Sequence, residues 1–279
     1  MKKVTLLIPC YNEESSLPAL HAALCEVMDS QVQYQWEVLL IDDGSRDQSL
    51  SVMRQLRRKD PRVAFISLSR NFGKENAMLA GFDHASGDCV IILDADLQHP
   101  PALIPDMLHL WEEGAQDVYA RRDIARESWL RRRLSRLYYS LLNRSTRFDV
   151  LENVGDFRLL DRRCILALRQ LRESQRYTKG MYVWIGFKKQ EISYHEQKRT
   201  AGQSSFNFRR LADLAIDGLT SYTTAPLRLS TLIGLLSALL AILYMVYVFI
   251  KTLVVGEAVQ GFPTIVILIL FLGGVQLIS

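Results

Sequence analysis

Short apolar runs alternate with amphipathic stretches over the first hundred residues. The runs cover residues 4–9, 37–41, 63–68 and 89–93. Between them, apolar side chains recur every three or four positions, which is the spacing of one helix face. Helices between short, fully apolar strands are typical of a parallel sheet covered on both faces. The helical faces are Leu17, Leu20, Leu24 and Met28, then Leu50, Met53 and Leu56, then a third within residues 73–85.

Helix-boundary residues accompany these faces. Ser15 and Ser16 stand where an N-cap is expected before the first helix. Gly87 stands where a C′ glycine would end the third. The pattern therefore predicts an α/β domain that begins with four parallel strands.

Polar side chains follow each of the four apolar runs. In parallel α/β sheets, ligands bind outside the carboxyl ends of the strands. Four polar strand ends at one edge therefore predict a single binding site. These ends are Tyr11-Asn12-Glu13, Asp42-Asp43, Ser69-Arg70-Asn71 and Asp94-Ala95-Asp96.

The pair Asp94 and Asp96 is the most informative of these ends. Two carboxylates spaced i and i+2 just past a buried strand can turn toward one hard cation, such as Mg²⁺ or Mn²⁺ held together with substrate phosphates. For an isolated pair, a solvated acidic turn is the more frequent explanation. The three neighbouring polar strand ends favour the metal interpretation here.

Charged residues disappear over a long stretch near the C-terminus. Residues 229–250 form a run of 22 without a charge, which at about 1.5 Å per residue is enough to cross a bilayer core. A buried helix of a soluble protein is the alternative, but no polar face interrupts the run. Residues 264–278 form a shorter apolar run. We expect either a second transmembrane helix that has been cut short or a segment lying in the interface.

Flanking charges predict the orientation of the first span. Arg209, Arg210 and Arg228 precede it, whereas Lys251 is the only basic residue in the loop that follows. The positive-inside rule then places the N-terminal part in the cytoplasm. The N-terminus has too short an apolar stretch for a signal peptide. The four cysteines form no Cys-x-x-Cys pair, which fits a reducing compartment and no zinc site.

Residues 121–147 differ in composition from the rest of the chain. They hold nine arginines against two acids, interleaved with leucine and tyrosine, and predict a basic amphipathic helix. Nucleic acid and an anionic membrane surface are both possible partners for such a helix. Because a transmembrane helix follows in the same chain, we favour the membrane and expect no nucleic acid.

These features predict three regions along the chain. Residues 1–204 form a cytoplasmic catalytic domain in which residues 121–147 face the membrane. Residues 205–226 form a juxtamembrane amphipathic segment. Residues 227–279 form the transmembrane region, with spans near residues 229–250 and 263–279, the second of them truncated.

Several common chemistries have no motif in this chain. Gly-x-Gly-x-x-Gly, the P-loop pattern and Gly-x-Ser-x-Gly are all absent from the sequence, so dinucleotide binding, P-loop phosphoryl transfer and serine hydrolysis are not supported. A sugar nucleotide fits the residues that remain. Its diphosphate needs a divalent cation that acts as a Lewis acid as the diphosphate departs, and Asp42 could accept a hydrogen bond from the N–H of a uracil ring.

Several segments of the chain resemble the motifs of a known family. Residues 8–14, 41–45 and 70–74, together with Asp94 and Asp96, resemble a family 2 glycosyltransferase of the GT-A fold, a mostly parallel Rossmann-like sheet with flanking helices. Residues 94–101, 155–162 and 225–228 narrow the resemblance to the polyprenyl-phosphate glycosyltransferases, the group that holds bactoprenol glucosyltransferase and dolichol-phosphate mannose synthase. The resemblance runs from end to end.

The resemblance implies roles for individual residues. Gln98 is expected beside Asp94 and Asp96, which would handle Mg²⁺ or Mn²⁺ and the diphosphate. Asp96, Asp156 and Arg122 are expected to be catalytic. The nucleotide would contact Pro9, Tyr11, Glu13, Asp42, Lys74 and Asp94. Phosphate groups of the lipid acceptor or the donor would contact Arg122, Arg131, Ser135 and Arg199.

Some roles stay open, and the chain departs from the family pattern in places. Asp156 could act as a base or as a structural cap, since a phosphate acceptor is already largely ionised at neutral pH. Ser205 stands where related sequences often have lysine, and Ala120 replaces a glycine. The Gln-x-x-Arg-Trp motif of processive polysaccharide synthases is absent from the sequence, which favours the transfer of a single sugar.

The expected function is an inverting, metal-dependent transfer of one sugar from a nucleotide donor to undecaprenyl phosphate. The donor is expected to be UDP-glucose, although no segment identifiably recognises the sugar. The alternatives are mannose, an amino-arabinose or N-acetylhexosamine on the same lipid, transfer to a protein or growing glycan, and a catalytically silent lipid-binding scaffold. We expect a homo-oligomer in the bacterial inner membrane, multi-pass, with a role in cell-envelope or O-antigen modification.

Overall fold

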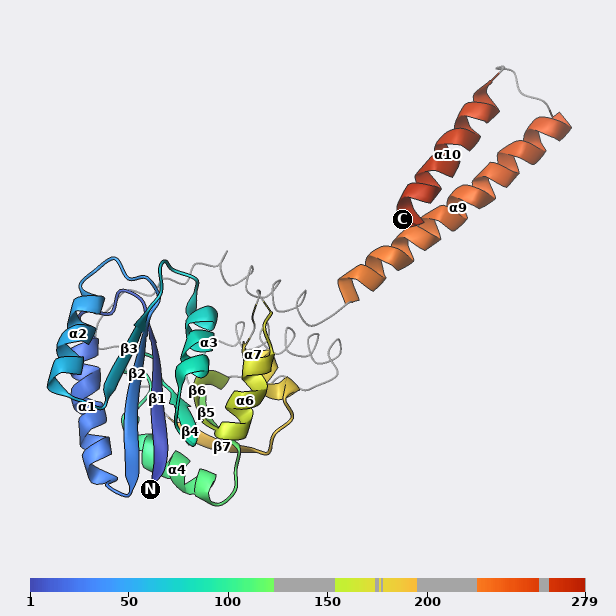
Figure 1. The fold of residues 1–279 in the computed structure, drawn as a ribbon. Coiled ribbons are helices and arrows are strands. Elements are labelled where there is room, and N and C mark those ends of the chain that lie inside the picture. Colours follow the sequence, from blue (N-terminus) through green and yellow to red (C-terminus); the bar gives the residue numbers. More distant parts are fainter. Residues whose placement is uncertain (123–153, 174–175, 177, 195–224, 256–260, 279) are drawn as a thin grey trace. The chain divides into compact units, whose positions relative to one another are not determined.

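The computed structural model describes residues 1–122, 154–173, 176, 178–194, 225–255 and 261–278 (Figure 1). Contacts within the chain divide it into two units, Met1–Ala215 and Ile216–Ser279. The predictions for Arg131, Ser135 and Arg199 lie outside the described residues, as do those for most of residues 121–147 and for residues 205–224.

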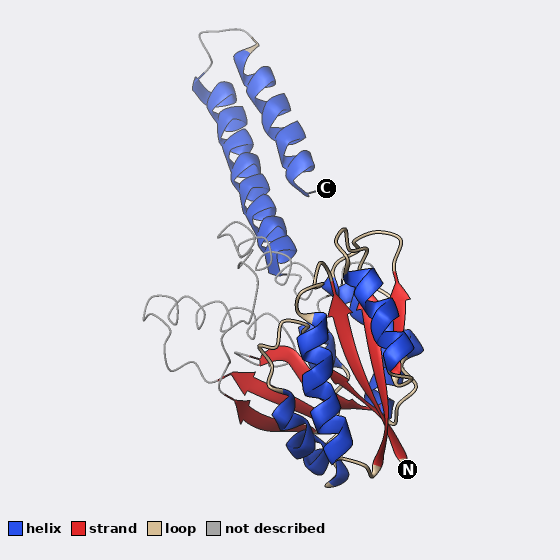
Figure 2. Cartoon of the chain, turned by 90° about the vertical axis from the view of Figure 1, so that its left-hand side faces the viewer, coloured by secondary structure: helices blue, strands red, loops and turns tan. Residues whose placement is uncertain are grey.

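A seven-stranded sheet forms the centre of the first unit (Figures 1 and 2). Its order is β3-β2-β1-β4-β6-β5-β7, in which the first four strands pair in parallel as the sequence predicts. β6 runs antiparallel to both β4 and β5, and β7 is parallel to β5. The strands are β1 (Lys2–Cys10), β2 (Tyr34–Asp42), β3 (Val63–Ser67), β4 (Cys89–Ile92), β5 (Asp117–Arg122), β6 (Val154–Asp161) and β7 (Lys189–Tyr194).

Helices cover both faces of this sheet, and each face has its own apolar core (Figure 1). α1, α2 and α4 pack on one face, and α3, α6 and α7 on the other. Leu6 and Leu7 of β1 belong to opposite cores, because successive side chains of a strand point to opposite faces. The helices are α1 (Leu17–Ser30), α2 (Ser49–Lys59), α3 (Lys74–His84), the 3₁₀ turn η1 (Pro101–Leu103), α4 (Ile104–Glu112), α6 (Arg162–Gln170) and α7 (Thr178–Trp184).

Of the two helix-boundary predictions, the N-cap position is confirmed and the C′ glycine is wrong. Ser16 is the N-cap of α1, but its hydroxyl donates to Glu13 Oε2 at 2.7 Å instead of capping the helix. α3 ends at His84 with Ala85 as its C-cap, so Gly87 is not its C′ residue. A Cβ at Gly87 would lie 2.8 Å from the backbone nitrogen of Thr5, so this glycine permits close approach to β1.

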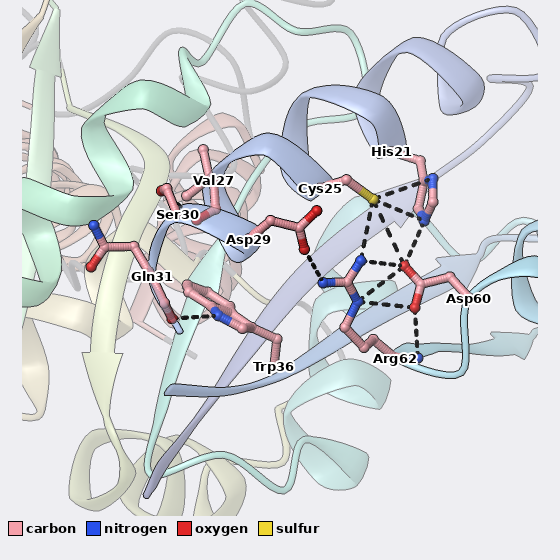
Figure 3. A network of polar contacts seen from close by, with 9 residues as sticks. All are labelled: His21, Cys25, Val27, Asp29, Ser30, Gln31, Trp36, Asp60 and Arg62. Atoms are coloured by element: carbon pink, nitrogen blue, oxygen red, sulfur yellow. Dashed lines mark hydrogen bonds and ion pairs between the residues drawn. The ribbon is translucent and has the colours of Figure 1, made fainter. Parts of the chain in front are cut away.

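A polar cluster fastens α1 to the start of β3 (Figure 3). His21 Nε2 lies 3.0 Å from Asp60 Oδ2, and Cys25 Sγ lies 3.7 Å from the same His21 nitrogen. These are the only three potential metal ligands that the structure groups together among the residues it describes. Arg62 already supplies the cation there, with Nη2 at 2.9 Å from Asp60 Oδ2 and 3.4 Å from Cys25 Sγ. Since a metal ion would be repelled by this guanidinium, we interpret the cluster as structural.

The described residues of the second unit form two apolar helices, α9 (Ala225–Val255) and α10 (Phe262–Ile278), which pack against each other. Within the described residues, one segment, Ser230–Val254, is long and apolar enough to cross a membrane. Large apolar side chains are exposed along it, among them Leu235, Leu240 and Leu253. A helix that is apolar all round needs an apolar surrounding. The apolar part of α10, Thr264–Gly273, is shorter, so a second span remains a prediction.

Candidate active site

A cleft of about 320 Å³ opens at the carboxyl ends of β1 and β4. It brings together six residues that the sequence nominated, from β1 and the segment after it, from the start of α3, and from the turn after β4. Six further residues line the same cleft. The nominated residues are Pro9, Tyr11, Glu13, Lys74, Asp94 and Asp96, and the others are Cys10, Asp43, Asn71, Gly73, Ala77 and Ala95.

Lys74 connects the two carboxylates that come from different strands. Its Nζ lies 2.5 Å from Asp94 Oδ1, after β4, and 2.7 Å from Asp156 Oδ2, on β6. Burial by itself would raise the pKa of Asp156, but the ammonium groups of Lys74 and Lys179 outweigh it and hold this pKa well below its usual range. Burial likewise opposes the charge of Lys74, and the two carboxylates reverse that effect and raise its pKa. Lys74 and Asp156 are therefore both charged at neutral pH.

The turn that carries Asp96 has an unusual backbone. Leu97 has φ of +58°, a left-handed conformation that branched side chains rarely adopt. Asp96 Oδ1 accepts a hydrogen bond from the backbone N–H of Gln98 at 3.1 Å, which closes the turn. Strained residues of this kind persist where the surrounding structure holds them, and they cluster at functional sites.

His99 packs against the same turn, and it was not among the site residues predicted from the sequence. Its ring is buried and stacks on Phe157 with 4.9 Å between centroids. The backbone N–H of Asp94 donates to His99 Nδ1 at 3.3 Å. Burial lowers the pKa of His99, so a neutral imidazole accepts this bond. Its place in the segment Gln98-His99-Pro100 is the only sequence signal that could have identified it.

The two aspartates at the carboxyl end of β2, Asp42 and Asp43, have different partners. Asp42 is buried, and its carboxylate accepts from the backbone N–H of Ser45 at 3.0 Å and from the Ser67 hydroxyl at 2.8 Å. It does not line the cleft, so its predicted contact with a nucleotide base stays a prediction. Asp43 belongs to one of the predicted polar strand ends, although it was given no role of its own. It lines the cleft and accepts from the backbone N–H groups of Phe72 and Gly73 at 2.8 and 2.9 Å.

Gly44 permits the close packing of these two loops. Its φ is +68°, and a Cβ there would lie 2.4 Å from the backbone carbon of Arg70. Only glycine tolerates both this backbone conformation and this contact. The Asp43–Gly44 pair therefore fixes the segment that leads into Lys74.

Further charged side chains are buried in the same part of the catalytic unit as Asp156. Arg158, on β6, forms a buried ion pair with Asp117, with Nη1 at 3.0 Å from Oδ2, and its guanidinium lies 3.7 Å from the ring centre of Tyr182. Glu75 follows Lys74 in α3, and its Oε2 accepts from the backbone N–H of Thr178 at 3.1 Å. Burial and the charge of Asp156 raise the pKa of Glu75 to about 7.

The raised pKa of Glu75 predicts a pH-dependent stability. Because the pKa of Glu75 is raised in the folded state, the folded protein keeps this proton at pH values where the unfolded chain has already lost it. The free energy of unfolding therefore falls as the pH rises through about 7. We expect Glu75→Gln to raise the free energy of unfolding by up to about 3 kcal/mol at pH 8 and to change little near pH 4.5. Thermal unfolding of the full chain across this pH range tests it, with the exposed Glu113→Gln as a control. An equal effect at both pH values would contradict it.

The remaining predicted site residues either do not line this cleft or lie outside the described residues. Asp156 and Gln98 adjoin the cleft through Lys74 and Asp96, respectively. Arg122 is the last residue of β5. Arg131, Ser135, Arg199 and the side chain of Arg122 lie outside the described residues, so their proposed phosphate contacts stay predictions.

The oxygen donors of the cleft fit a hard divalent cation. Asp94 and Asp96 supply two carboxylates from one turn, and Mg²⁺ is usually held by one or two carboxylates, with substrate phosphates and water completing its shell. The ammonium of Lys74 lies against Asp94 Oδ1, so a metal ion bound at Asp94 would share this carboxylate with a positive charge. Asp94 and Asp96 offer only carboxylate oxygens, the ligand type that hard cations prefer.

Known proteins resemble this chain over nearly its whole length. The profile of glycosyl transferase family 2 matches residues 5–168. A bactoprenol glucosyl transferase of Shigella phage SfV is 41% identical over 278 residues, covering 99% of this chain and 90% of that protein. A prophage bactoprenol glucosyl transferase homolog of Escherichia coli (strain K12) is 39% identical with the same coverage of both.

Solved structures agree with the fold. A mannosyl-3-phosphoglycerate synthase from Rubrobacter xylanophilus superposes with a TM-score of 0.51 at 15% identity, covering 77% of this chain and 71% of that one. At this identity the likeness shows only the fold, a GT-A-like α/β domain with a mostly parallel sheet. The family match and the full-length relatives go further. The chain belongs to glycosyl transferase family 2, and it is a glycosyltransferase.

Proposed function

We propose that this enzyme transfers one glucose from UDP-glucose to undecaprenyl phosphate at the cytoplasmic face of the membrane. The observation that carries the proposal is the cleft that joins Pro9, Tyr11 and Glu13 to Asp94 and Asp96 at the carboxyl ends of the strands. The lipid acceptor is suggested by relatives named bactoprenol glucosyl transferase. The bilayer-length segment Ser230–Val254 in the same chain supports it.

In this proposal one part of the cleft binds the nucleoside of the donor and another part binds its diphosphate. The wall formed by Pro9, Tyr11 and Glu13 would hold the nucleoside, with Asp42 accepting from the uracil N–H. Asp94 and Asp96, with Gln98 beside them, would hold Mg²⁺ or Mn²⁺. When bound, such an ion acts as a Lewis acid that neutralises the charge on the departing diphosphate.

The proposed reaction is a single displacement at the sugar. A phosphate oxygen of undecaprenyl phosphate attacks the anomeric carbon, the bond from that carbon to the UDP oxygen breaks, and UDP leaves with the electron pair, so the configuration inverts. Since the second pKa of a phosphate monoester is about 6, the acceptor needs little help from a base. The depressed pKa of Asp156 makes it a weak base at neutral pH, which supports an electrostatic role. Arg122, Arg131, Ser135 and Arg199 would hold the acceptor phosphate.

The remaining details are proposals of the same kind. We propose the cytoplasm for the catalytic unit, a second membrane span in residues 263–279, and a homo-oligomer. Transfer of one sugar at a time is proposed because the processive motif is absent from the sequence.

Measurement of UDP release tests this function. With the full chain in lipid nanodiscs, we expect UDP release from UDP-glucose to rise by at least about tenfold when undecaprenyl phosphate is added, because the acceptor oxygen lies on that phosphate. Undecaprenol, which lacks the phosphate, is the matched control. Equal release with both lipids would contradict a phosphate acceptor. GDP-mannose, UDP-N-acetylglucosamine and a UDP-amino-sugar tested in parallel identify the donor, and no turnover with any of them would favour a silent scaffold.

A further inference from the structure

The position of Lys74 is not explained by nucleotide binding alone. Its ammonium bridges Asp94 and Asp156 at 2.5 and 2.7 Å. Asp156 is buried, and its other oxygen, Oδ1, has no hydrogen-bond partner among the described residues. A buried carboxylate without a compensating cation is strongly destabilising. Lys74 is therefore the counter-ion that keeps Asp156 ionised, and it holds Asp94 with the same ammonium.

The same Asp94 is one of the two carboxylates that the cleft offers to a divalent cation. The ammonium lies against Asp94 Oδ1, so a metal ion bound to this carboxylate would lie within a few ångströms of a positive charge. Repulsion between a unit charge and a divalent ion at such a distance is large wherever bulk water does not screen it. In the ligand-free cleft, Lys74 and the metal ion therefore compete for Asp94.

We propose that Lys74 is an internal placeholder cation, which keeps Asp94 from binding metal until the diphosphate of the donor enters the cleft. The inference rests on the proposed function, because it takes a nucleoside diphosphate as the arriving anion. Its consequence is that the nucleotide and the metal ion bind cooperatively, and that the protein without nucleotide binds the metal weakly.

The structure gives Lys74 room to change partners. Its side chain is 39% exposed and lines the same cleft as Asp94 and Asp96. Lysine has a flexible four-carbon stem and three rotatable donors, so its ammonium can turn to phosphate oxygens without movement of the helix. Asp156 lies deeper, and Lys179 also acts on it electrostatically. Asp156 therefore keeps one compensating charge when Lys74 turns away.

Mn²⁺ binding to the nucleotide-free protein tests this inference. With the full chain in nanodiscs, free Mn²⁺ is measured by electron paramagnetic resonance as the ion is added. We expect Lys74→Met to bind Mn²⁺ at least about tenfold more tightly than the wild type, because the competing charge is gone. Lys74→Arg keeps the charge and should bind Mn²⁺ as weakly as the wild type. Lys179→Met is the matched control. Lys179 acts electrostatically on Asp156 but forms no ion pair with Asp94 among the described residues, so its loss should leave Mn²⁺ binding close to the wild type.

Three further measurements make the comparison decisive. The affinity gained in Lys74→Met should disappear in the double variant Lys74→Met/Asp94→Asn. If Lys74→Met lowers the melting temperature, Lys74→Gln provides the same comparison, since its amide can still bond to a carboxylate. Saturating UDP should tighten Mn²⁺ binding more in the wild type than in Lys74→Met.

The outcomes separate this inference from the proposed function. Mn²⁺ affinity that is no tighter in Lys74→Met and Lys74→Gln than in the wild type overturns the placeholder role, and so does an equal gain in Lys74→Arg. Neither result bears on sugar transfer. Conversely, failure of undecaprenyl phosphate to stimulate UDP release would contradict the proposed acceptor while leaving the nucleotide-free Mn²⁺ comparison valid.

Discussion

Replacement of Asp96 with alanine is expected to abolish sugar transfer and to leave the catalytic unit folded. Asp96 lines the cleft, and its carboxylate accepts a hydrogen bond from the backbone of Gln98 in the same turn. The substitution would remove a proposed metal ligand at the point where charge develops on the departing diphosphate. Losses of this kind reach about 10³-fold in turnover. UDP release with undecaprenyl phosphate measures the loss, and the melting temperature checks that the fold is kept.

The matched control for this variant is Asp106→Ala. Asp106 is exposed on α4, outside the cleft lining, so its removal should leave turnover near the wild-type value. Mn²⁺ binding provides a second readout, because Asp96→Ala should weaken it whether or not the lipid is present. Near-normal turnover by Asp96→Ala would rule out the metal assignment.

The first half of the sheet could be predicted from the sequence because its strands are uniformly apolar. β1, β2 and β4 are almost entirely buried, and β3 is partly buried at the edge of the sheet, so their apolar sequences stand out from the helices between them. The polar strand ends then locate the cleft, since parallel strands present their carboxyl ends at one edge. For this reason Tyr11, Glu13, Asp94 and Asp96 were expected together from the strand pattern, whereas Pro9 was added by the resemblance to the family.

The second half could not be predicted in this way. β6 lies between β4 and β5, yet it carries Asp156 and Arg158, and charges of this kind argue against a buried strand. Each is tolerated because of a partner distant in sequence, Lys74 for Asp156 and Asp117 for Arg158. Neither pairing leaves a local pattern. The charge bridge between Asp94, Lys74 and Asp156 was therefore visible only in the structure.

The ion pair beneath the cleft predicts the largest change in stability. Arg158 is 2% exposed and Asp117 is 0% exposed, and Asp117 accepts from Arg158 Nη1 with both oxygens, at 3.2 and 3.0 Å. In Asp117→Asn the guanidinium would stay buried with its charge uncompensated, and Arg158 Nε already has no partner among the described residues. Removal of one member of such a pair costs about 3–5 kcal/mol. We expect the melting temperature of the full chain to fall by about 10 °C.

Two comparisons distinguish this effect from a general loss of charge. Asp83 and Arg172 form an ion pair at 2.7 Å in which the arginine side chain is more than half exposed. Because solvent screens that pair, Asp83→Asn should cost less than about 1 kcal/mol. The double variant Asp117→Leu/Arg158→Met removes both buried charges together and should recover most of the stability that Asp117→Asn loses, since well-packed apolar residues can replace a buried pair at little cost. A melting temperature in Asp117→Asn equal to that in Asp83→Asn would show that β6 does not depend on this pair. The sheet would then tolerate its charged strand through the stacking of Arg158 on Tyr182.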